Sequence, residues 1–210
     1  MAGTQEVFEL VEKGRSRQIA AAVQAAVDAG VEPSVILNDG MIAAMDSVGK
    51  KFSAGEVFVP EMLVAAKAMK KGVDVLKPYL AEGEAGANGK VIIGTVQGDL
   101  HDIGKNLVAM MLESSGFEVI DLGVDVDKNL FQTTLQENPD TKIVCCSALL
   151  TTTMPALKET VAMLNDQPNR KDFSVMIGGA PITDDFAKDV GADYYSPDAA
   201  GAAQTAKAAV

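Results

Sequence analysis

The only histidine of the chain lies in a short segment of polar and small residues that follows an apolar run. The segment begins at Gly98 and ends at Gly104, and it holds Asp99 two residues before His101. An aspartate at this spacing can accept a hydrogen bond from one ring nitrogen, which fixes the tautomer and leaves the other nitrogen free to hold a metal. The same pair is typical of a helix-capping aspartate beside a loop histidine. Metal ligation and helix capping are therefore the two interpretations that this segment alone supports.

Other chemistries fit the sequence poorly. A glycine-rich turn that opens a helix can bind phosphate, but residues 94–104 contain neither the GxGxxG nor the GxxxxGK[ST] spacing. Cys145 and Cys146 are adjacent in an apolar run, so they point to opposite faces of a strand and are badly placed for a disulfide with each other. With one histidine, the chain also lacks a cluster at the spacing of zinc or iron–sulfur ligands. We therefore expect any metal to enter inside a cofactor and the cysteines to be core residues.

The His101 segment belongs to a region in which short apolar runs alternate with helical patterns. Continuous apolar runs suit strands that are covered on both faces, and their alternation with helices predicts a doubly wound parallel sheet of five strands. Ligands of such sheets bind beyond the carboxyl ends of the strands, where the strand order reverses. The predicted strands are 91–96, 117–122, 142–149, 173–179 and 192–196, and the predicted helices are 103–115, 127–137, 154–165, 183–190 and a last, alanine-rich helix after Pro197.

The N-terminal part of the chain has a different pattern, with apolar residues three and four positions apart. This spacing predicts four helices, and four helices of this size form a small bundle. Residues 81–90 are small and polar, which is typical of a linker between domains. We therefore expect a helical bundle domain at 1–80, with helices at 4–13, 15–29, 33–50 and 60–80, followed by the linker at 81–90 and a sheet domain at 91–210.

The charge of the chain limits its partners. Its 210 residues include 18 Lys and Arg against 29 Asp and Glu, which gives a formal charge of −11. A surface of this sign repels nucleic acid and anionic lipid, so we expect neither nucleic acid nor membrane as a partner. No apolar stretch reaches the roughly 20 residues of a membrane helix, and the N-terminal residues include acids where a signal peptide carries basic residues. These features predict a cytoplasmic protein.

Two further motifs follow predicted strands. Ser147-Ala148-Leu149 closes the third strand, and Gly178-Gly179 closes the fourth. Together with Asp99-x-His101-x-x-Gly104, they resemble the DxHxxG, SxL and GG fingerprint of the cobalamin-binding domain of the methionine synthase and methylmalonyl-CoA mutase type. Phe58-Val59-Pro60-Glu61 resembles the segment that opens the last helix of the four-helix cap in the methyl-carrying branch of that family. The chain is thus similar, over nearly its whole length, to the free-standing corrinoid proteins of methanol, methylamine, glycine betaine and aryl-ether methyl transfer systems.

This resemblance implies a four-helix cap followed by a flavodoxin-like, Rossmann-like cobalamin-binding domain. It implies that His101 is the axial ligand to the cobalt of the corrinoid, with Asp99 as its hydrogen-bond partner and Thr153 as the hydroxyl that continues the relay. The position of the proton along this relay would bias the cobalt between its six-coordinate methylated form and its four-coordinate reduced form. The other cofactor-binding residues implied by the resemblance are Gly98, Asp102, Ile103, Gly104, Ser147, Leu149, Thr151, Gly178, Gly179, Phe58 and Met62, with Phe58 as an apolar lid over the methyl group.

For function, the resemblance implies a methyl carrier whose catalysis lies in partner proteins, so that the chain itself is not an enzyme. A substrate-specific methyltransferase would load the methyl group onto the cobalt of cobalamin, and a second methyltransferase would pass it to a pterin or thiol acceptor. A reductive activator is the third implied partner. The methyl donor stays open among methanol, methylamines, quaternary amines and methoxyarenes, because donor choice is made in the partner enzyme. The final acceptor and the oligomeric state also stay open.

A B12-dependent sensor is the alternative function, because such sensors use the same pair of cap and corrinoid domain. Sensors need an output module, typically a DNA-binding helix-turn-helix, for which the sequence offers neither spare length nor positive charge. A flavodoxin-like or response-regulator-like domain would explain the sheet but leave the cap and the three motifs unexplained. A radical mutase subunit shares the motifs, but the Phe58–Pro60 segment belongs to the methyl-transfer branch.

Overall fold

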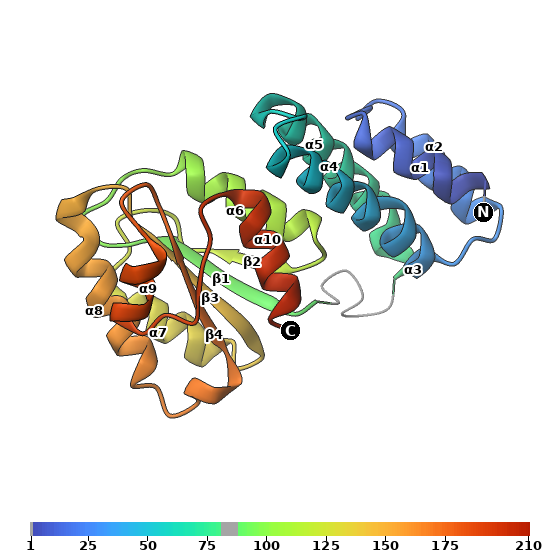
Figure 1. The fold of residues 1–210 in the computed structure, drawn as a ribbon. Coiled ribbons are helices and arrows are strands. Elements are labelled where there is room, and N and C mark those ends of the chain that lie inside the picture. The colour runs from blue at the N-terminus through green and yellow to red at the C-terminus, as the bar shows by residue number, and fades with distance from the viewer. Residues whose placement is uncertain (1, 81–87) are drawn as a thin grey trace. The chain divides into compact units, whose positions relative to one another are not determined.

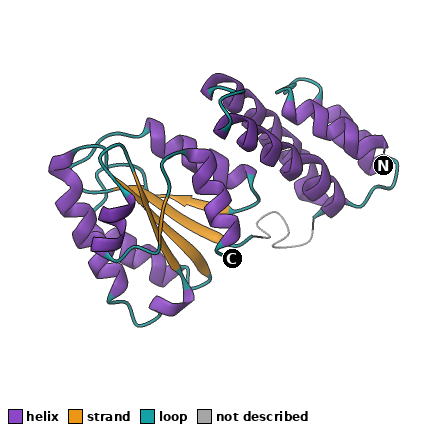
Figure 2. Ribbon diagram, in the orientation of Figure 1, coloured by secondary structure: helices purple, strands orange, loops and turns teal. Residues whose placement is uncertain are grey.

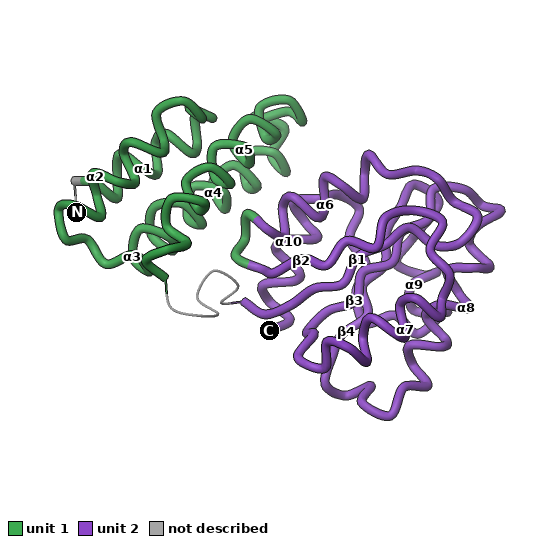
Figure 3. The backbone as a smooth tube through the Cα atoms, turned by 180° about the vertical axis from the view of Figure 1, so that it is seen from behind, with its two compact units in different colours: residues 1–87, 114–116 green, residues 88–113, 117–210 purple. Residues whose placement is uncertain are grey.

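The chain folds into two compact units, one made of helices and one built around a sheet (Figure 1). The computed structural model describes residues 2–80 and 88–210, so the predicted linker lies outside the described residues at positions 81–87. The first unit comprises residues 1–87 with 114–116, and the second comprises residues 88–113 with 117–210 (Figure 3). Within the described ranges, every helix falls short of the length and apolar character needed to span a bilayer.

The first unit packs its helices through the apolar stripes that the sequence pattern predicts. The side chains of Met41, Met45 and Met69 are buried, as expected for the core of a bundle. Between two of the helices, the Glu12 carboxylate accepts hydrogen bonds from Ser47 and Lys51 at 2.7 Å each. The helices of this unit are α1 (Ala2–Glu12), α2 (Ile19–Asp28), α3 (Pro33–Val35), α4 (Ala43–Ser53) and α5 (Val59–Leu76), with a π-helical segment at Ile36–Ile42 and a 3₁₀ turn at Lys77–Tyr79.

The prediction of one continuous helix at 33–50 is wrong in detail. It consists of the short helix α3, the π-helical segment and α4. Over seven residues the apolar spacing does not separate an α-helical turn from a wider one, because Ile36, Leu37 and Met41 are buried in either case. Within this segment Gly40 approaches α1 closely: an added Cβ would lie 3.3 Å from the Thr4 carbonyl oxygen.

The second unit is a five-stranded parallel sheet with helices on both faces (Figure 2). Its strand order is β2-β1-β3-β4-β5, the order of flavodoxin-like folds, so the predicted fold class is confirmed. Each predicted element is present, and its ends differ from the prediction by a few residues. The strands are β1 (Lys90–Thr95), β2 (Glu118–Asp121), β3 (Thr141–Ser147), β4 (Ser174–Gly178) and β5 (Tyr194–Tyr195), and the helices are α6 (Ile103–Ser114), α7 (Lys128–Glu137), α8 (Met154–Asn165), α9 (Asp184–Val190) and α10 (Ala199–Ala208).

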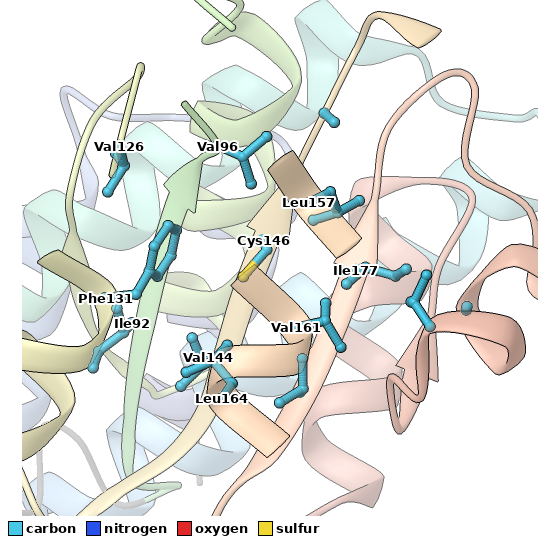
Figure 4. Packing of buried hydrophobic residues seen from close by; sticks show 14 of the residues in the cluster. Ile92, Val96, Val126, Phe131, Val144, Cys146, Leu157, Val161, Leu164 and Ile177 are labelled. Atoms are coloured by element: carbon cyan, nitrogen blue, oxygen red, sulfur yellow. The ribbon is translucent and has the colours of Figure 1, made fainter. Parts of the chain in front are cut away.

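Each face of the sheet has its own apolar core. Helices α7, α8 and α9 cover one face, where Phe131 and Leu157 pack with Cys146 of β3 (Figure 4). Helices α6 and α10 cover the other face, where Leu112 packs with Cys145. The two cysteines therefore point to opposite faces, as the sequence predicts. Burial raises the pKa of the Cys145 thiol to about 12 and that of Cys146 well above its ordinary value, which agrees with core residues.

The strand order reverses between β1 and β3, which lie side by side at the centre of the sheet. In one direction the chain continues to β2, and in the other it continues to β4 and β5. The chain therefore leaves the carboxyl ends of β1 and β3 in opposite directions, and ligands of this fold class bind at such a point. The His101 segment follows β1, and the Ser147 segment closes β3.

We predict that Phe131→Ala destabilises the sheet unit by about 3–5 kcal/mol, because a buried aromatic ring leaves a cavity. The Phe131 ring is fully buried and lies against Gly94 of β1, where an added Cβ would approach it to 2.8 Å. Leu130→Ala is the matched control, because this neighbour on α7 is exposed and its truncation should cost less than about 0.5 kcal/mol. Urea denaturation followed by circular dichroism measures both values, and equal losses for the two variants would contradict the packing described.

Candidate functional site

The residues that the sequence singles out lie in three loops at the carboxyl edge of the sheet. Residues 98–104 follow β1, residues 147–153 close β3 and lead into α8, and Gly178–Gly179 close β4. The 3₁₀ turn Thr151–Thr153 precedes α8 and turns Thr153 inward, so that it is buried. The structure thus brings the three sequence motifs to one edge. Phe58 and Met62 belong to the helical unit and are described separately below.

Asp99 is the centre of this edge. Its side chain is fully buried, and Oδ1 accepts hydrogen bonds from the His101 backbone N–H at 3.1 Å and from His101 Nδ1 at 2.7 Å. Oδ2 accepts from the Leu149 backbone N–H at 2.7 Å and from the Thr153 hydroxyl at 2.8 Å. Four donors match the four lone-pair positions of a carboxylate. This single side chain therefore joins the loop after β1 to the loop after β3.

Asp99 is ionised at neutral pH. Burial by itself would raise the pKa of this carboxyl, but the hydrogen bonds from the Leu149 amide, from the ring and amide of His101 and from Thr153 outweigh it. Together they hold the pKa of Asp99 well below its usual range. A buried negative charge with a full set of donors is the state that this loop stabilises.

The orientation of His101 follows from the charge of Asp99. An ionised carboxylate only accepts hydrogen bonds, so Nδ1 of His101 carries the proton that lies between the two groups. In the neutral ring Nε2 is then the nitrogen with a free lone pair. The His101 side chain is 49% exposed, so this nitrogen belongs to a ring that solvent or a ligand can reach. Helix capping does not account for this contact, because the Asp99 carboxylate binds the imidazole ring itself.

Exposed apolar side chains flank the histidine. Leu100, in the loop after β1, is 73% exposed, and Ile103, the first residue of α6, is 85% exposed. Across the edge, Leu149 and Leu150 are also exposed, at 40% and 41%. A group of large apolar side chains at the carboxyl edge of such a sheet indicates a surface that a ligand covers.

Thr95 is a buried residue of the site that the sequence analysis missed. Its hydroxyl lies 2.9 Å from the His101 carbonyl oxygen and 2.9 Å from the Ser147 hydroxyl. Thr95 is the last residue of β1 and is the register partner of Ser147 on β3. A threonine at the end of a predicted strand was the only signal in the sequence, and strands commonly contain threonine for packing alone.

Asp125 is the second residue that the sequence analysis missed. Its carboxylate accepts a hydrogen bond from the Gly98 backbone N–H at 2.7 Å, and its own N–H donates to the Asp99 carbonyl oxygen at 2.9 Å. Its φ of 54° is in the left-handed region, which aspartate tolerates better than most residues. Gly98 has a φ of 81°, so the turn itself requires a glycine there. The 123–126 loop thereby fixes the start of the His101 segment.

The predicted glycines have different structural reasons. Gly179 has a φ of 133°, and an added Cβ would lie 1.8 Å from the Ala148 carbonyl oxygen, so the crossing of the β3 and β4 loops requires it. At Gly178 an added Cβ would lie 3.3 Å from the Ser196 carbonyl oxygen. At Gly104, in the first turn of α6, an added Cβ would meet no atom of the described residues within 4 Å. The fold explains Gly179, whereas it leaves Gly104 without a structural reason.

Three more of the predicted residues lie at this edge with different degrees of exposure. Asp102 and Thr151 are exposed, and the Asp102 carboxylate accepts a hydrogen bond from Asn106 Nδ2 at 3.2 Å. Ser147 is partly exposed. Asp102 directly precedes α6 and Asn106 lies in its first turn, so their contact stabilises the start of the helix that carries Gly104.

Phe58 and Met62, both in the helical unit, differ in the exposure of their side chains. Pro60 lies in the first turn of α5, and Glu61 accepts a hydrogen bond from the Phe58 backbone N–H at 2.9 Å, so the helix begins directly after Phe58. The Phe58 side chain is 65% exposed. Met62 is completely buried on the same stripe of α5 as Met69, and its contact with a cofactor stays a prediction.

Comparisons with known proteins give a consistent result. B12 binding domain families match residues 89–204 and residues 4–77 of this chain. Dimethylamine corrinoid protein 1 of Methanosarcina acetivorans is 42% identical over 191 residues, which cover 89% of this chain and 89% of that protein. Trimethylamine corrinoid protein 2 of the same organism is 40% identical over 217 residues, which cover 100% of this chain and 99% of that protein.

Solved structures agree with these sequence matches. The crystal structure of a cobalamin-binding protein from Desulfitobacterium hafniense DCB-2 is similar with a TM-score of 0.82 at 31% identity, over 99% of this chain and 98% of that chain. A chain in the crystal structure of the methanol:cobalamin methyltransferase complex MtaBC from Methanosarcina barkeri is similar with a TM-score of 0.83 at 29% identity. That match covers 99% of this chain and 79% of that chain.

We predict that Gly179→Ala destabilises the sheet unit by at least about 2 kcal/mol, because it combines a left-handed φ with a clash against backbone. Gly104→Ala is the matched control. This substitution should leave stability unchanged or raise it by up to about 1 kcal/mol, because alanine has a higher helix propensity than glycine and its Cβ meets no neighbour among the described residues. Chemical denaturation compares the two, and a stable Gly179→Ala protein would contradict the loop crossing.

A pH series tests the charge of Asp99. A lowered pKa in the folded state contributes stability that is fully present above the unfolded value of about 3.9 and is lost as pH falls below it. We predict that Asp99→Asn costs about 2 kcal/mol at pH 7, because an amide cannot accept from all four donors, and that this cost shrinks in acid. Urea denaturation across the pH range measures it, with the exposed neighbour Asp102→Asn as the control. A cost that stays constant down to the lowest pH would contradict a buried charge.

Proposed function

The chain belongs to the family of corrinoid proteins with B12 binding domains, and we propose that it carries a methyl group on the cobalt of its corrinoid between two partner methyltransferases. The observation that carries this proposal is the pair formed by the ionised, buried Asp99 and the half-exposed His101. The pair fixes one tautomer of the histidine and leaves Nε2 as a ligand nitrogen.

The residues at the carboxyl edge fit a corrinoid. Imidazole is a suitable axial ligand for its cobalt, and Asp99 occupies the other ring nitrogen as metal-bound histidines usually require. The exposed apolar side chains of Leu100, Ile103, Leu149 and Leu150 offer a surface for a large, flat ring system. An added Cβ at Gly104 would meet no atom of the described residues within 4 Å, so the fold itself does not require a glycine at this position. We propose on these grounds that His101 is the axial ligand.

The side chains behind His101 control the donor strength of its ring. When bound, the corrinoid supplies a cobalt that accepts a methyl group from one partner and gives it up to another. Asp99 keeps Nδ1 protonated and polarises the ring, so Nε2 is held in place as the nitrogen that donates to a metal. Thr153 donates to Asp99 and reduces the charge available to the ring. We propose that the hydrogen bonds along Thr153, Asp99 and His101 set how strongly the histidine holds the metal.

We propose that the nucleotide tail of the cofactor binds among the loops of β1, β3 and β4. Ser147 is partly exposed and offers a hydroxyl, and Leu149 offers an apolar wall. Phe58 remains our candidate for the lid over the methyl group, since it is a large exposed aromatic ring at the start of a helix. The tail site would also include Gly98, Asp102, Ile103, Gly104, Thr151, Gly178 and Gly179.

The partners follow from the proposed carrier role. We propose a substrate-specific methyltransferase as the first partner, because a similar solved chain belongs to a complex with a methanol:cobalamin methyltransferase. We propose a methylamine as the methyl donor, because two similar proteins are named for dimethylamine and trimethylamine. A pterin- or thiol-dependent methyltransferase and a reductive activator complete the set, and we propose that the system works in the cytoplasm.

Anaerobic reconstitution with cobalamin tests the proposal. The wild-type protein should retain corrinoid after desalting, and a methylamine methyltransferase with its substrate should then change the visible spectrum. Gly104→Ala should retain far less corrinoid at unchanged stability, because its new methyl group meets only the ligand. His101→Ala should retain some corrinoid but lose the spectrum of imidazole ligation. A wild-type protein that binds no corrinoid would contradict the proposal.

A further inference from the structure

A buried pair of hydroxyls connects the end of β3 to the backbone of His101. Thr95 on β1 and Ser147 on β3 are register partners of adjacent strands, so the sheet itself fixes the distance between them. Their oxygens lie 2.9 Å apart, and Thr95 Oγ1 also lies 2.9 Å from the His101 carbonyl oxygen. Thr95 is only 1% exposed, so water does not compete for its single proton. The backbone of Thr95 is itself held by hydrogen bonds to residues 123 and 126.

The geometry sets the direction of both hydrogen bonds. A carbonyl oxygen only accepts, so Thr95 must donate its single proton to His101. At the other contact Thr95 can then only accept, so Ser147 is the donor. In this arrangement the proton of Ser147 is therefore committed to Thr95, and Ser147 offers only lone pairs to a ligand.

A ligand that accepts a hydrogen bond from Ser147 would reverse this pair. Ser147 would then donate to the ligand, and Thr95 would have to donate to Ser147 to keep their contact. The His101 carbonyl would lose its hydrogen bond from Thr95. A ligand that donates to Ser147, or that leaves it untouched, would keep the original direction.

We propose that Thr95 is a positioning residue that makes the hold on the His101 backbone depend on what binds against Ser147. This proposal rests on the proposed function, in which the nucleotide tail of cobalamin lies beside Ser147. The dimethylbenzimidazole of that tail has a ring nitrogen that accepts a hydrogen bond when it is not bound to cobalt. Arrival of the tail thus releases the backbone of His101, while Asp99 keeps the orientation of its ring.

The hold on His101 can be tested first in the corrinoid-free protein. Thr95→Val keeps the shape of the side chain and removes the hydroxyl, whereas Thr95→Ser keeps the hydroxyl. Hydrogen–deuterium exchange of residues 97–104 should speed up roughly fivefold in Thr95→Val, as expected for one lost neutral hydrogen bond, and should stay near wild type in Thr95→Ser. Equal exchange in all three proteins would overturn the role of Thr95.

The dependence on the tail is tested by comparing cobalamin with cobinamide, which lacks the nucleotide tail. The ratio of imidazole-ligated to unligated corrinoid is read from the visible spectrum. Thr95→Val should lower this ratio roughly fivefold with cobinamide but hardly at all with cobalamin, because the tail has already released His101 in the wild type. Thr95→Ser should restore the wild-type values.

Each remaining outcome has a distinct meaning. An equal loss with both corrinoids would show that Thr95 acts only as a structural residue, which overturns the coupling. A wild-type protein that retains neither corrinoid would overturn the proposed function and the coupling together. In that case the exchange experiment still decides whether Thr95 holds the His101 segment.

Discussion

The buried negative charge of Asp99 is the interaction on which the site depends. A carboxylate without donors in this position would be unstable, so the two central loops must bring four donors to it. Two come from His101, one from the Leu149 backbone and one from Thr153. The same requirement fixes the histidine ring, because its Nδ1–H is one of those donors. Charge burial and ligand orientation are therefore one feature of this protein.

The sheet topology makes this arrangement possible. The β1 and β3 strands are neighbours at the point where the strand order reverses, so the loops that follow them are within hydrogen-bond reach of each other. The register that places Thr95 opposite Ser147 adds a second connection between the two strands and His101. Thr95 contacts the backbone carbonyl of His101, whereas Asp99 contacts its ring. Two independent sets of hydrogen bonds thus position one exposed residue, while its apolar neighbours Leu100 and Ile103 stay free of the core.

The sequence predicted the sheet unit well because its central strands β1, β3 and β4 are apolar runs that are largely buried, and they alternate with helical patterns. It predicted that Asp99 and His101 pair because their separation is short. It could not predict Thr95, because a buried threonine looks the same whether it packs or donates, nor Asp125, whose role depends on a loop of left-handed backbone. In the helical unit it missed the π-helical segment, since apolar spacing over seven residues does not separate turn types. The burial of Met62 likewise depends on which stripe of α5 faces the core.

We propose that the ring of His101 binds cobalt through the nitrogen that Asp99 leaves free. The chain has a single histidine, so growth on ¹⁵N-histidine labels this one ring. Electron paramagnetic resonance of the protein loaded with paramagnetic Co(II) corrinoid measures the nuclear spin of the axial nitrogen directly. The triplet splitting of the unlabelled protein should become a doublet on labelling and disappear in His101→Ala. A triplet that persists in the labelled protein would show that the base of the cofactor, and not His101, holds the metal.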